Sequence, residues 1–221
     1  AIGIYGAAGE EVVDEETFKH HNVYYYKKRK CSRLVVFSVR SRKFAALTLV
    51  EKDLRSIISW LTTASNITSK YSKEDSNVVI RQNAEDGDLQ KALLVSSVTF
   101  YGRLFTQSEG RRMKLEKSWI KEDDLIETHE EVMALRHNFA AHSGVTDVEK
   151  VDVIVAIDPV KRRGTTPMLV TELAQPDMIG AETENEDDFL RLVKHLWEIT
   201  KEKKDKIQLE IHNEEIVPKG L

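Results

Sequence analysis

Residues 41–65 read SRKFAALTLVEKDLRSIISWLTTAS, and this stretch decides the fold class. Its large apolar residues recur at intervals of three and four, as one face of an α-helix requires: Phe44, Leu47, Val50, Leu54, Ile57, Ile58 and Leu61. The spacing predicts a helix over about 42–65. An apolar stripe of this length is unfavourable in water, so the helix must pack against other helices.

Three further stretches carry the same periodicity and predict helices over about 88–107, 123–143 and 184–208. Their apolar faces are Leu89, Ala92, Leu93, Phe100 and Leu104; then Leu125, Ile126, Val132, Met133 and Ala140; then Phe189, Leu192, Val193, Leu196 and Ile199. The third helix begins at the acidic pair Asp123 and Asp124, which suits the positive end of a helix dipole, and stops at Gly144. Between the first two helices, residues 66–86 are polar and predict a loop.

Short β-branched runs predict a small β element. A hairpin is expected over 150–172, a strand at 34–39 that pairs with 23–26, and a loosely ordered lead-in over 1–22. The fold class we expect is mainly α, a bundle of about four long helices with this β element and N-terminal strands. We divide the chain into a basic, partly extended segment at 1–41, a helical domain at 42–208 that contains the hairpin, and a tail at 209–221.

Composition restricts the class of protein. The 221 residues are 41% hydrophobic and 32% charged, which is typical of a globular chain of one or two domains. No apolar run approaches the roughly 18 residues of a membrane span, and no signal-peptide pattern opens the chain. The single cysteine, Cys31, forms no internal disulfide, so we expect a reducing, cytoplasmic location and no membrane contact.

The net charge of −4 excludes bulk attraction to nucleic acid, but the charge is unevenly distributed. Between Phe18 and Val50 there are nine basic residues and no acidic one. Tyrosines at 24–26 lie beside Lys27, Lys28, Arg29 and Lys30, a mixture typical of platforms for single-stranded nucleic acid. These four residues are candidate RNA contacts. Alternatively, the segment is a solvated arm that docks on the acidic remainder of this chain or of a second copy.

A second basic run, which includes Arg111 and Arg112, links the second and third helices. It could guide an RNA backbone or be an ordinary solvated loop. Gly102, within the second helix, indicates either tight helix packing or the close approach of another backbone.

The sequence lacks the glycine-rich loops that bind nucleotide phosphates, the HExxH motif of zinc proteases and the GxSxG motif of serine hydrolases. Three histidines, His129, His137 and His142, belong instead to the predicted third helix, beside Arg136 and Asn138. The spacings of eight and five between the histidines do not align metal ligands on one face. We therefore expect no metal and no cofactor, and a metal-dependent hydrolase ranks last among the functions considered.

Residues 133–144 read MALRHNFAAHSG. This segment resembles the signature of the HEPN superfamily: an arginine, then usually Asn, Asp or His, and a histidine a few residues later near a helix end. Arg136, His137 and His142 match these positions. The resemblance extends more loosely to a helical bundle over 42–208 that carries the motif on its third long helix. It implies a metal-independent endoribonuclease of the toxin or anti-phage defence type, controlled by a cognate antitoxin or another defence-system partner.

The chemistry of the residues agrees with this implication. Histidine exchanges protons near pH 7, and the guanidinium of arginine offers a planar fork of donors to a phosphate. We assign His142 as general acid or base, Arg136 as phosphate clamp, and His137 and Asn138 as positioning groups. On an ideal helix Arg136 and His142 differ by about 240° in azimuth, so we expect one copy alone to leave the site incomplete. A homodimer with facing motifs, common in this superfamily, would complete it.

Structural roles are the alternatives for the same residues. Arg136 could form a buried ion pair, His142 could cap the helix C-terminus, His137 could be a surface residue, and His129 could be a hydrogen-bonded core residue. The whole chain could also be a non-catalytic module that dimerises through its bundle and binds RNA or a protein through its basic arm.

Overall fold

The computed structural model describes residues 8–13, 20–32, 34–71, 84–107, 113–137, 150–157, 159–160, 166–174 and 188–219. The chain divides into two compact units, Ala1–Ser38 and Val39–Leu221. The first unit is a small sheet, and the second contains the helices and a separate hairpin. We describe each unit by itself.

The first unit contains an antiparallel sheet in the order β1, β2, β3. Strand β1 (Ala8–Val13) pairs with β2 (His20–Tyr26), from Ala8 opposite Tyr25 to Val13 opposite His20. Strand β2 also pairs with the short β3 (Arg29–Lys30). Lys27 and Lys28 make the turn between them in left-handed conformations, with φ of 47° and 66°.

Two N-terminal predictions were wrong. Residues 8–13, expected to be loosely ordered, form β1, because their pairing with β2 supplies hydrogen bonds that no local periodicity reveals. The strand expected at 34–39 is not formed: residues 34–37 lie outside any ladder, and Val39 already begins a helix. Leu34 and Phe37 are 67% and 90% exposed, so this β-branched run has no buried face to favour a strand. The predicted strand at 23–26 is confirmed within β2.

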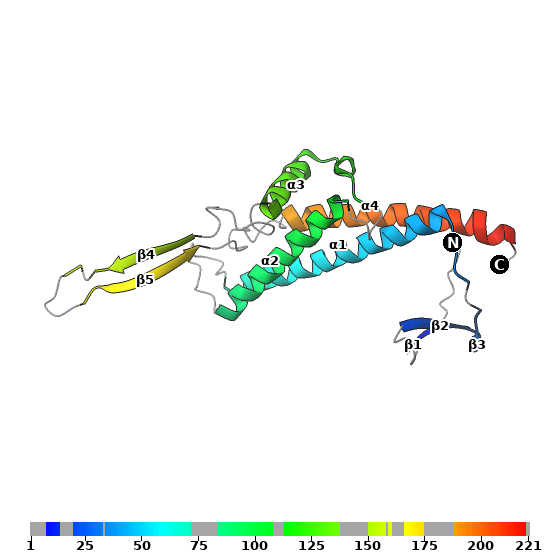
Figure 1. Ribbon diagram of the computed structural model, residues 1–221, viewed down its shortest axis with the longest axis horizontal. Helices are drawn as coiled ribbons and strands as arrows, with labels where there is room; N and C mark the ends of the chain where they lie inside the picture. The colour runs from blue at the N-terminus through cyan, green and yellow to red at the C-terminus, as the bar shows by residue number, and fades with distance from the viewer. Residues whose placement is uncertain are drawn as a thin grey trace. The chain divides into compact units, whose positions relative to one another are not determined.

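The second unit is a bundle of helices α1 (Val39–Ser69), α2 (Ala84–Phe105), α3 (Asp123–Leu135) and α4 (Asp188–Ile211) (Figure 1). Helix α1 packs against α2 and α4, and α3 packs against α4 and α2. The mainly α bundle with a small β element is therefore confirmed. Residues 66–69 and 84–86, predicted as loop, are helical. The expected tail also differs, because α4 runs on into a π-helical turn at His212–Ile216 and a 3₁₀ turn at Val217–Lys219.

The core combines the predicted stripes of α1, α3 and α4 with Val98, Tyr101 and Leu104 of α2. The apolar side chains buried there from these three helices include Val50, Leu54, Ile57, Leu61, Leu125, Val132, Phe189, Leu192, Val193 and Leu196. The segment between α2 and α3 contributes Leu115 and Ile120. Each buried Leu, Ile or Phe side chain contributes about 1.5–3 kcal/mol, and this burial outweighs the weak intrinsic stability of the separate helices.

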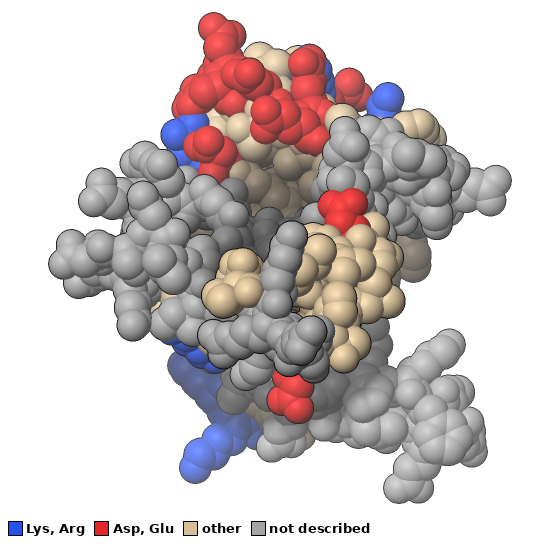
Figure 2. Space-filling model, turned by 90° about the vertical axis from the view of Figure 1, so that its left-hand side faces the viewer, with Lys and Arg blue, Asp and Glu red and all other residues tan. Residues whose placement is uncertain are grey.

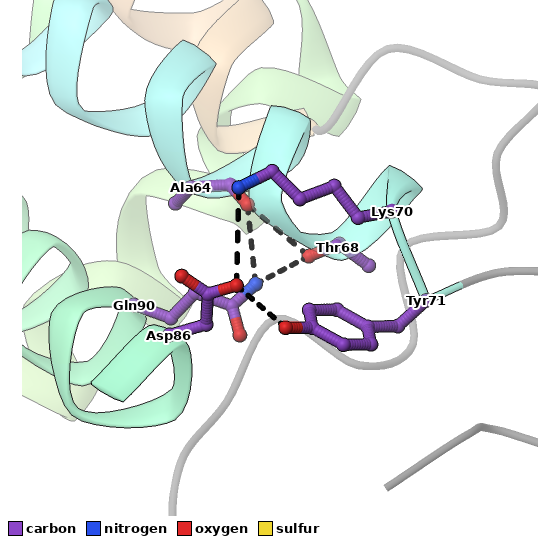
Figure 3. Close-up of polar contacts among 6 residues, drawn as sticks. All are labelled: Ala64, Thr68, Lys70, Tyr71, Asp86 and Gln90. Atoms are coloured by element: carbon purple, nitrogen blue, oxygen red, sulfur yellow. Dashed lines mark hydrogen bonds and ion pairs between the residues drawn. The ribbon is translucent and has the colours of Figure 1, made fainter. Parts of the chain in front are cut away.

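Helix α2 buries only part of the face predicted for it: Leu104 is buried, and Leu93 and Phe100 are partly buried. Leu89 is 46% exposed and Ala92 is exposed, whereas Gln90, Ser97, Val98, Tyr101 and Leu104 are buried. Hydrogen bonds to α1 explain the buried glutamine, because its Nε2 donates to the carbonyl of Ala64 and to Thr68 Oγ1 (Figure 3).

Next to this contact the Tyr71 hydroxyl donates to Asp86 Oδ2 at 2.6 Å, and Lys70 Nζ lies 3.8 Å from the same oxygen (Figure 3). Tyr71 and Lys70 follow the end of α1, and Asp86 lies in the first turn of α2. These polar contacts fix the end of α1 against the start of α2. The spacing of apolar residues in the sequence could not predict them.

Strands β4 (Lys150–Ala156) and β5 (Met168–Ala174) form the predicted hairpin, from Lys150 opposite Ala174 to Ala156 opposite Met168. Val151, Val153 and Val155 alternate along β4 and lie on one face of the ribbon. All three are more than half exposed.

In the part of the chain that the structure describes, no helix is long and apolar enough to cross a bilayer.

Candidate active site

The predicted site residues divide between described and undescribed parts of the chain. Arg136 and His137 lie in a π-type turn at the end of α3. Asn138, His142, Arg111 and Arg112 lie outside the described residues, as does the predicted end of the third helix near 143. The geometry of the candidate site is therefore the geometry of Arg136 and of the residues that hold it.

The backbone of Arg136 remains helical, with φ −57° and ψ −46°, and its N–H donates to the carbonyls of Met133 and Val132. Side chains on a helix lean toward its N-terminal end, so the half-buried Arg136 side chain can extend back along α3. It lies against Gly102 of α2. A Cβ atom placed on Gly102 would overlap Arg136 Cδ and Nε and lie 3.1 Å from Cζ.

A short chain of hydrogen bonds fixes the guanidinium at this place. Arg136 Nη1 donates to Thr106 Oγ1 at 3.2 Å, and the Thr106 hydroxyl in turn donates to the carbonyl of Gly102 at 2.8 Å. The threonine hydroxyl thus donates a hydrogen bond to the backbone of α2 and accepts one from the guanidinium. Gly102 both makes room for the arginine and orients the hydroxyl that receives it.

A second, buried contact joins the same two helices. Tyr101, which precedes Gly102, has its hydroxyl 2.7 Å from Nδ1 of His129 on α3. The ring of Phe105 lies 4.5 Å from the imidazole, centroid to centroid. His129 and Arg136 are seven residues apart and share a face of the helix. The predicted role of His129 as a hydrogen-bonded core residue is confirmed.

Burial sets the protonation states of this pair. Desolvation raises the pKa of Tyr101, so its hydroxyl keeps its proton. Desolvation, followed by the positive charge of Lys117, lowers the pKa of His129, although the nearby Glu130 carboxylate raises it. Both groups are therefore neutral, and one hydrogen bond joins the phenol to Nδ1 of the imidazole. Such a pair fixes helices in place without burying a charge.

The outer surface of α3 is acidic. Its exposed residues include Asp123, Asp124, Glu127, Glu130 and Glu131, and Figure 2 shows acidic side chains gathered at the top of the view, where α3 lies in Figure 1. Lys117 binds Glu130, and Arg191 binds Asp124. This field repels a polyanion from the outer face of α3.

The alternative of a buried ion pair for Arg136 has no support among the described residues, where no carboxylate lies within ion-pair distance of its guanidinium. The neighbouring Arg103 differs in this respect, since its Nη2 lies 2.9 Å from Oδ2 of the buried Asp53 and its guanidinium covers the Phe100 ring. His137 is exposed, as expected for a surface residue. No cluster of three or more metal-binding side chains occurs within the described ranges.

The basic turn belongs to the other unit. Lys27, Lys28, Arg29 and Lys30 are all exposed. Lys30 lies opposite Tyr25 in the ladder, so a cation and an aromatic ring share one face of the sheet. This is the combination expected of a surface that binds single-stranded nucleic acid through its backbone and bases.

Sequence reasoning singled out Arg136 and Gly102 separately and missed Thr106 and the pairing of Tyr101 with His129. A glycine in a helix interior was the available signal, since it destabilises a helix unless something requires the space. The approach it permits is that of a side chain, not of a backbone. Comparisons of this chain with protein-family models, with curated proteins and with solved structures found no match.

Proposed function

We propose that this chain is a metal-independent endoribonuclease of the toxin or anti-phage defence type, with Arg136 and His142 as its catalytic pair. One observation carries the proposal. The Arg136 guanidinium is held at the end of α3 by a glycine and a neutral hydroxyl, with no carboxylate partner among the described residues. An arginine with a purely structural role at a half-buried position is usually neutralised by an acid. An arginine that is held only by neutral groups still has an unpaired positive charge, which can bind an anion.

The reaction needs only the groups assigned to it. The 2′-hydroxyl of a ribose attacks the adjacent phosphorus and gives up its proton to a base, the P–O5′ bond breaks, and the leaving O5′ takes up a proton. The products are a 2′,3′-cyclic phosphate and a 5′-hydroxyl. His142 moves a proton, Arg136 balances the charge that grows on the phosphate, and His137 and Asn138 position these groups.

The test is cleavage of a labelled mixed-sequence RNA in EDTA by the wild type, Arg136→Ala and His142→Ala. We expect 2′,3′-cyclic phosphate ends from the wild type and a loss of at least about 10²-fold in rate for each variant. His212→Ala, which changes a histidine in the turn after α4, is the matched control and should cleave normally. Equal cleavage by all four proteins would contradict the assignment of the pair.

A non-catalytic RNA-binding module is the second candidate, favoured by the exposed basic turn at 27–30. It predicts binding without cleavage. Replacing Lys27, Lys28, Arg29 and Lys30 together by glutamine should weaken RNA binding and flatten its dependence on salt, since each lost phosphate contact removes about 0.7 from the slope for a single strand. Salt dependence that is unchanged in this variant would rule out the turn as the RNA contact.

A nuclease of this kind would act in the cytoplasm and would damage its own host unless restrained. The proposal therefore includes a homodimer in which the two motifs face each other, and a cognate antitoxin or defence-system partner that controls cleavage. RNA is the substrate, and the chemistry requires no cofactor.

A further inference from the structure

We infer that Gly102 is a positioning residue for Arg136: its missing side chain creates the space for the arginine, and its carbonyl anchors the hydroxyl that receives the guanidinium. The role in catalysis rests on the proposed nuclease function. The role in orienting the Arg136 side chain is independent of that function and can be measured even if the protein has no nuclease activity.

The first argument is the identity of the atoms around Gly102. Apart from Gly102 itself, its two chain neighbours and the nearby backbone of its own helix, the three heavy atoms nearest to a Cβ at this position all belong to the Arg136 side chain: Cδ, Nε and Cζ. If the glycine served close packing of two helices, the nearest atoms would include the neighbouring backbone. The space is therefore matched to one side chain, which comes from a residue 34 positions later in the chain.

The second argument is the position of the glycine. Gly102 is buried in the last turn of α2, where alanine would be favoured by helix propensity. Tyr101 on one side and Thr106 one turn later both contact α3 or its end, through His129 and Arg136. The residues around Gly102 thus already fix the two helices, and the glycine determines where the arginine side chain lies between them.

The consequence is a defined direction for the guanidinium. An arginine side chain has five N–H donors, and among the described contacts one of them, on Nη1, is used by Thr106. The remaining donors can form two parallel hydrogen bonds to the oxygens of a phosphodiester. A methyl group at position 102 would displace Nε and Cζ of Arg136 and so change the direction of these donors. The fold can accommodate the methyl group because the arginine side chain is flexible.

The experiment compares Gly102→Ala with Gly87→Ala. Both glycines lie in α2 and both substitutions increase helix propensity, but Gly87 lies in the first turn, about 22 Å away along the axis. We expect Gly102→Ala to reduce kcat about 10²-fold with a smaller change in KM, because the clamp acts on charge that develops in the transition state. Gly87→Ala should behave as the wild type.

A double-mutant cycle separates positioning from a general effect on the fold. In an Arg136→Ala background, Gly102→Ala should cause no further loss, because the side chain that it displaces is gone. A further loss of similar size in that background would overturn the inference.

A second measurement does not depend on activity. The Nε–Hε resonance of Arg136, assigned by its loss in Arg136→Lys, should shift in Gly102→Ala and stay in place in Gly87→Ala. If the wild type cleaves no RNA, the nuclease proposal fails while this measurement still decides the positioning role. An unshifted Arg136 resonance in Gly102→Ala would overturn that role even in an active enzyme.

Discussion

His129 is 7% exposed, and its Nδ1 forms a hydrogen bond with the Tyr101 hydroxyl. Burial lowers its pKa below the ordinary value of 6.5, so the native state resists protonation that the unfolded chain accepts. We therefore expect the free energy of unfolding to decrease as the pH falls below about 6.5, with a slope of at most about 1.4 kcal/mol per pH unit from this residue. Urea unfolding between pH 7.5 and 5 measures this slope.

His129→Gln provides the comparison, because an amide can still form a hydrogen bond with the tyrosine hydroxyl but does not titrate. The slope between pH 7 and 5.5 should be smaller in this variant. Glu130, whose pKa is lowered mainly by its hydrogen bond to Lys117, contributes at lower pH: its stabilisation is present above its ordinary pKa and is lost as the pH falls through the depressed one. A slope in His129→Gln equal to that of the wild type would assign the pH dependence to other groups.

Thr106 tests the hydroxyl that lies between Gly102 and Arg136. Thr106→Val keeps the shape of the side chain but removes the acceptor for Arg136 Nη1, so cleavage should decrease by about 10-fold, the equivalent of one modest hydrogen bond. Thr106→Ser keeps the hydroxyl and should retain most of the activity. Equal rates for the valine and serine variants would show that the hydroxyl does not orient the guanidinium during cleavage.

At the scale of the elements, α1 should carry a large share of the stability. Leu54 is 0% exposed in the core, whereas Leu49 on the same helix is 46% exposed. Leu54→Ala should lower the free energy of unfolding by about 2–5 kcal/mol, because it removes buried surface and leaves a cavity. Leu49→Ala has the same chemistry and helix propensity change, so its cost should be well under half as large. Chemical denaturation of the two variants tests the assigned core face.

Periodicity predicted the helices well where burial is apolar and continuous. The stripes of α1 and α4 agree with the buried residues because Leu, Ile and Val there face a uniform core. Helix α2 was predicted less well, because Gln90 is buried by hydrogen bonds to α1 while Leu89 beside it is half exposed. Strand β1 was missed for a related reason: its pairing with β2 depends on residues elsewhere in the chain.

In the candidate site, too, local patterns could be predicted from the sequence and contacts between distant residues could not. Arg136 and His137 could be found because they stand together in a short motif. The contact of Arg136 with Gly102 and Thr106 joins residues at least 30 positions apart, and only the packing of α2 against α3 brings them together. Sequence reasoning therefore pointed to Arg136 as a candidate, while the residues that contact its side chain could be found only in the fold.

At the scale of the whole molecule, the separation of Arg136 and His142 on an ideal helix motivates a site shared between two copies. If each site uses the arginine of one copy and the histidine of the other, mixing inactive Arg136→Ala and His142→Ala proteins should restore cleavage. In such a heterodimer one of the two sites has both groups intact. Random exchange makes half of the dimers mixed, so about a quarter of the wild-type activity should return.

Denaturing and refolding the two variants together, then measuring cleavage of labelled RNA, tests this expectation. Each variant refolded alone should remain inactive, and a mixture of either variant with the double variant Arg136→Ala/His142→Ala should also remain inactive, since no site then contains both groups. Restored activity in the first mixture only would place the two halves of the site on different copies. Recovery in neither mixture, from proteins shown by light scattering to exchange subunits, would place Arg136 and His142 of one site on the same copy. The arginine held over Gly102 would then have to serve the histidine of its own chain.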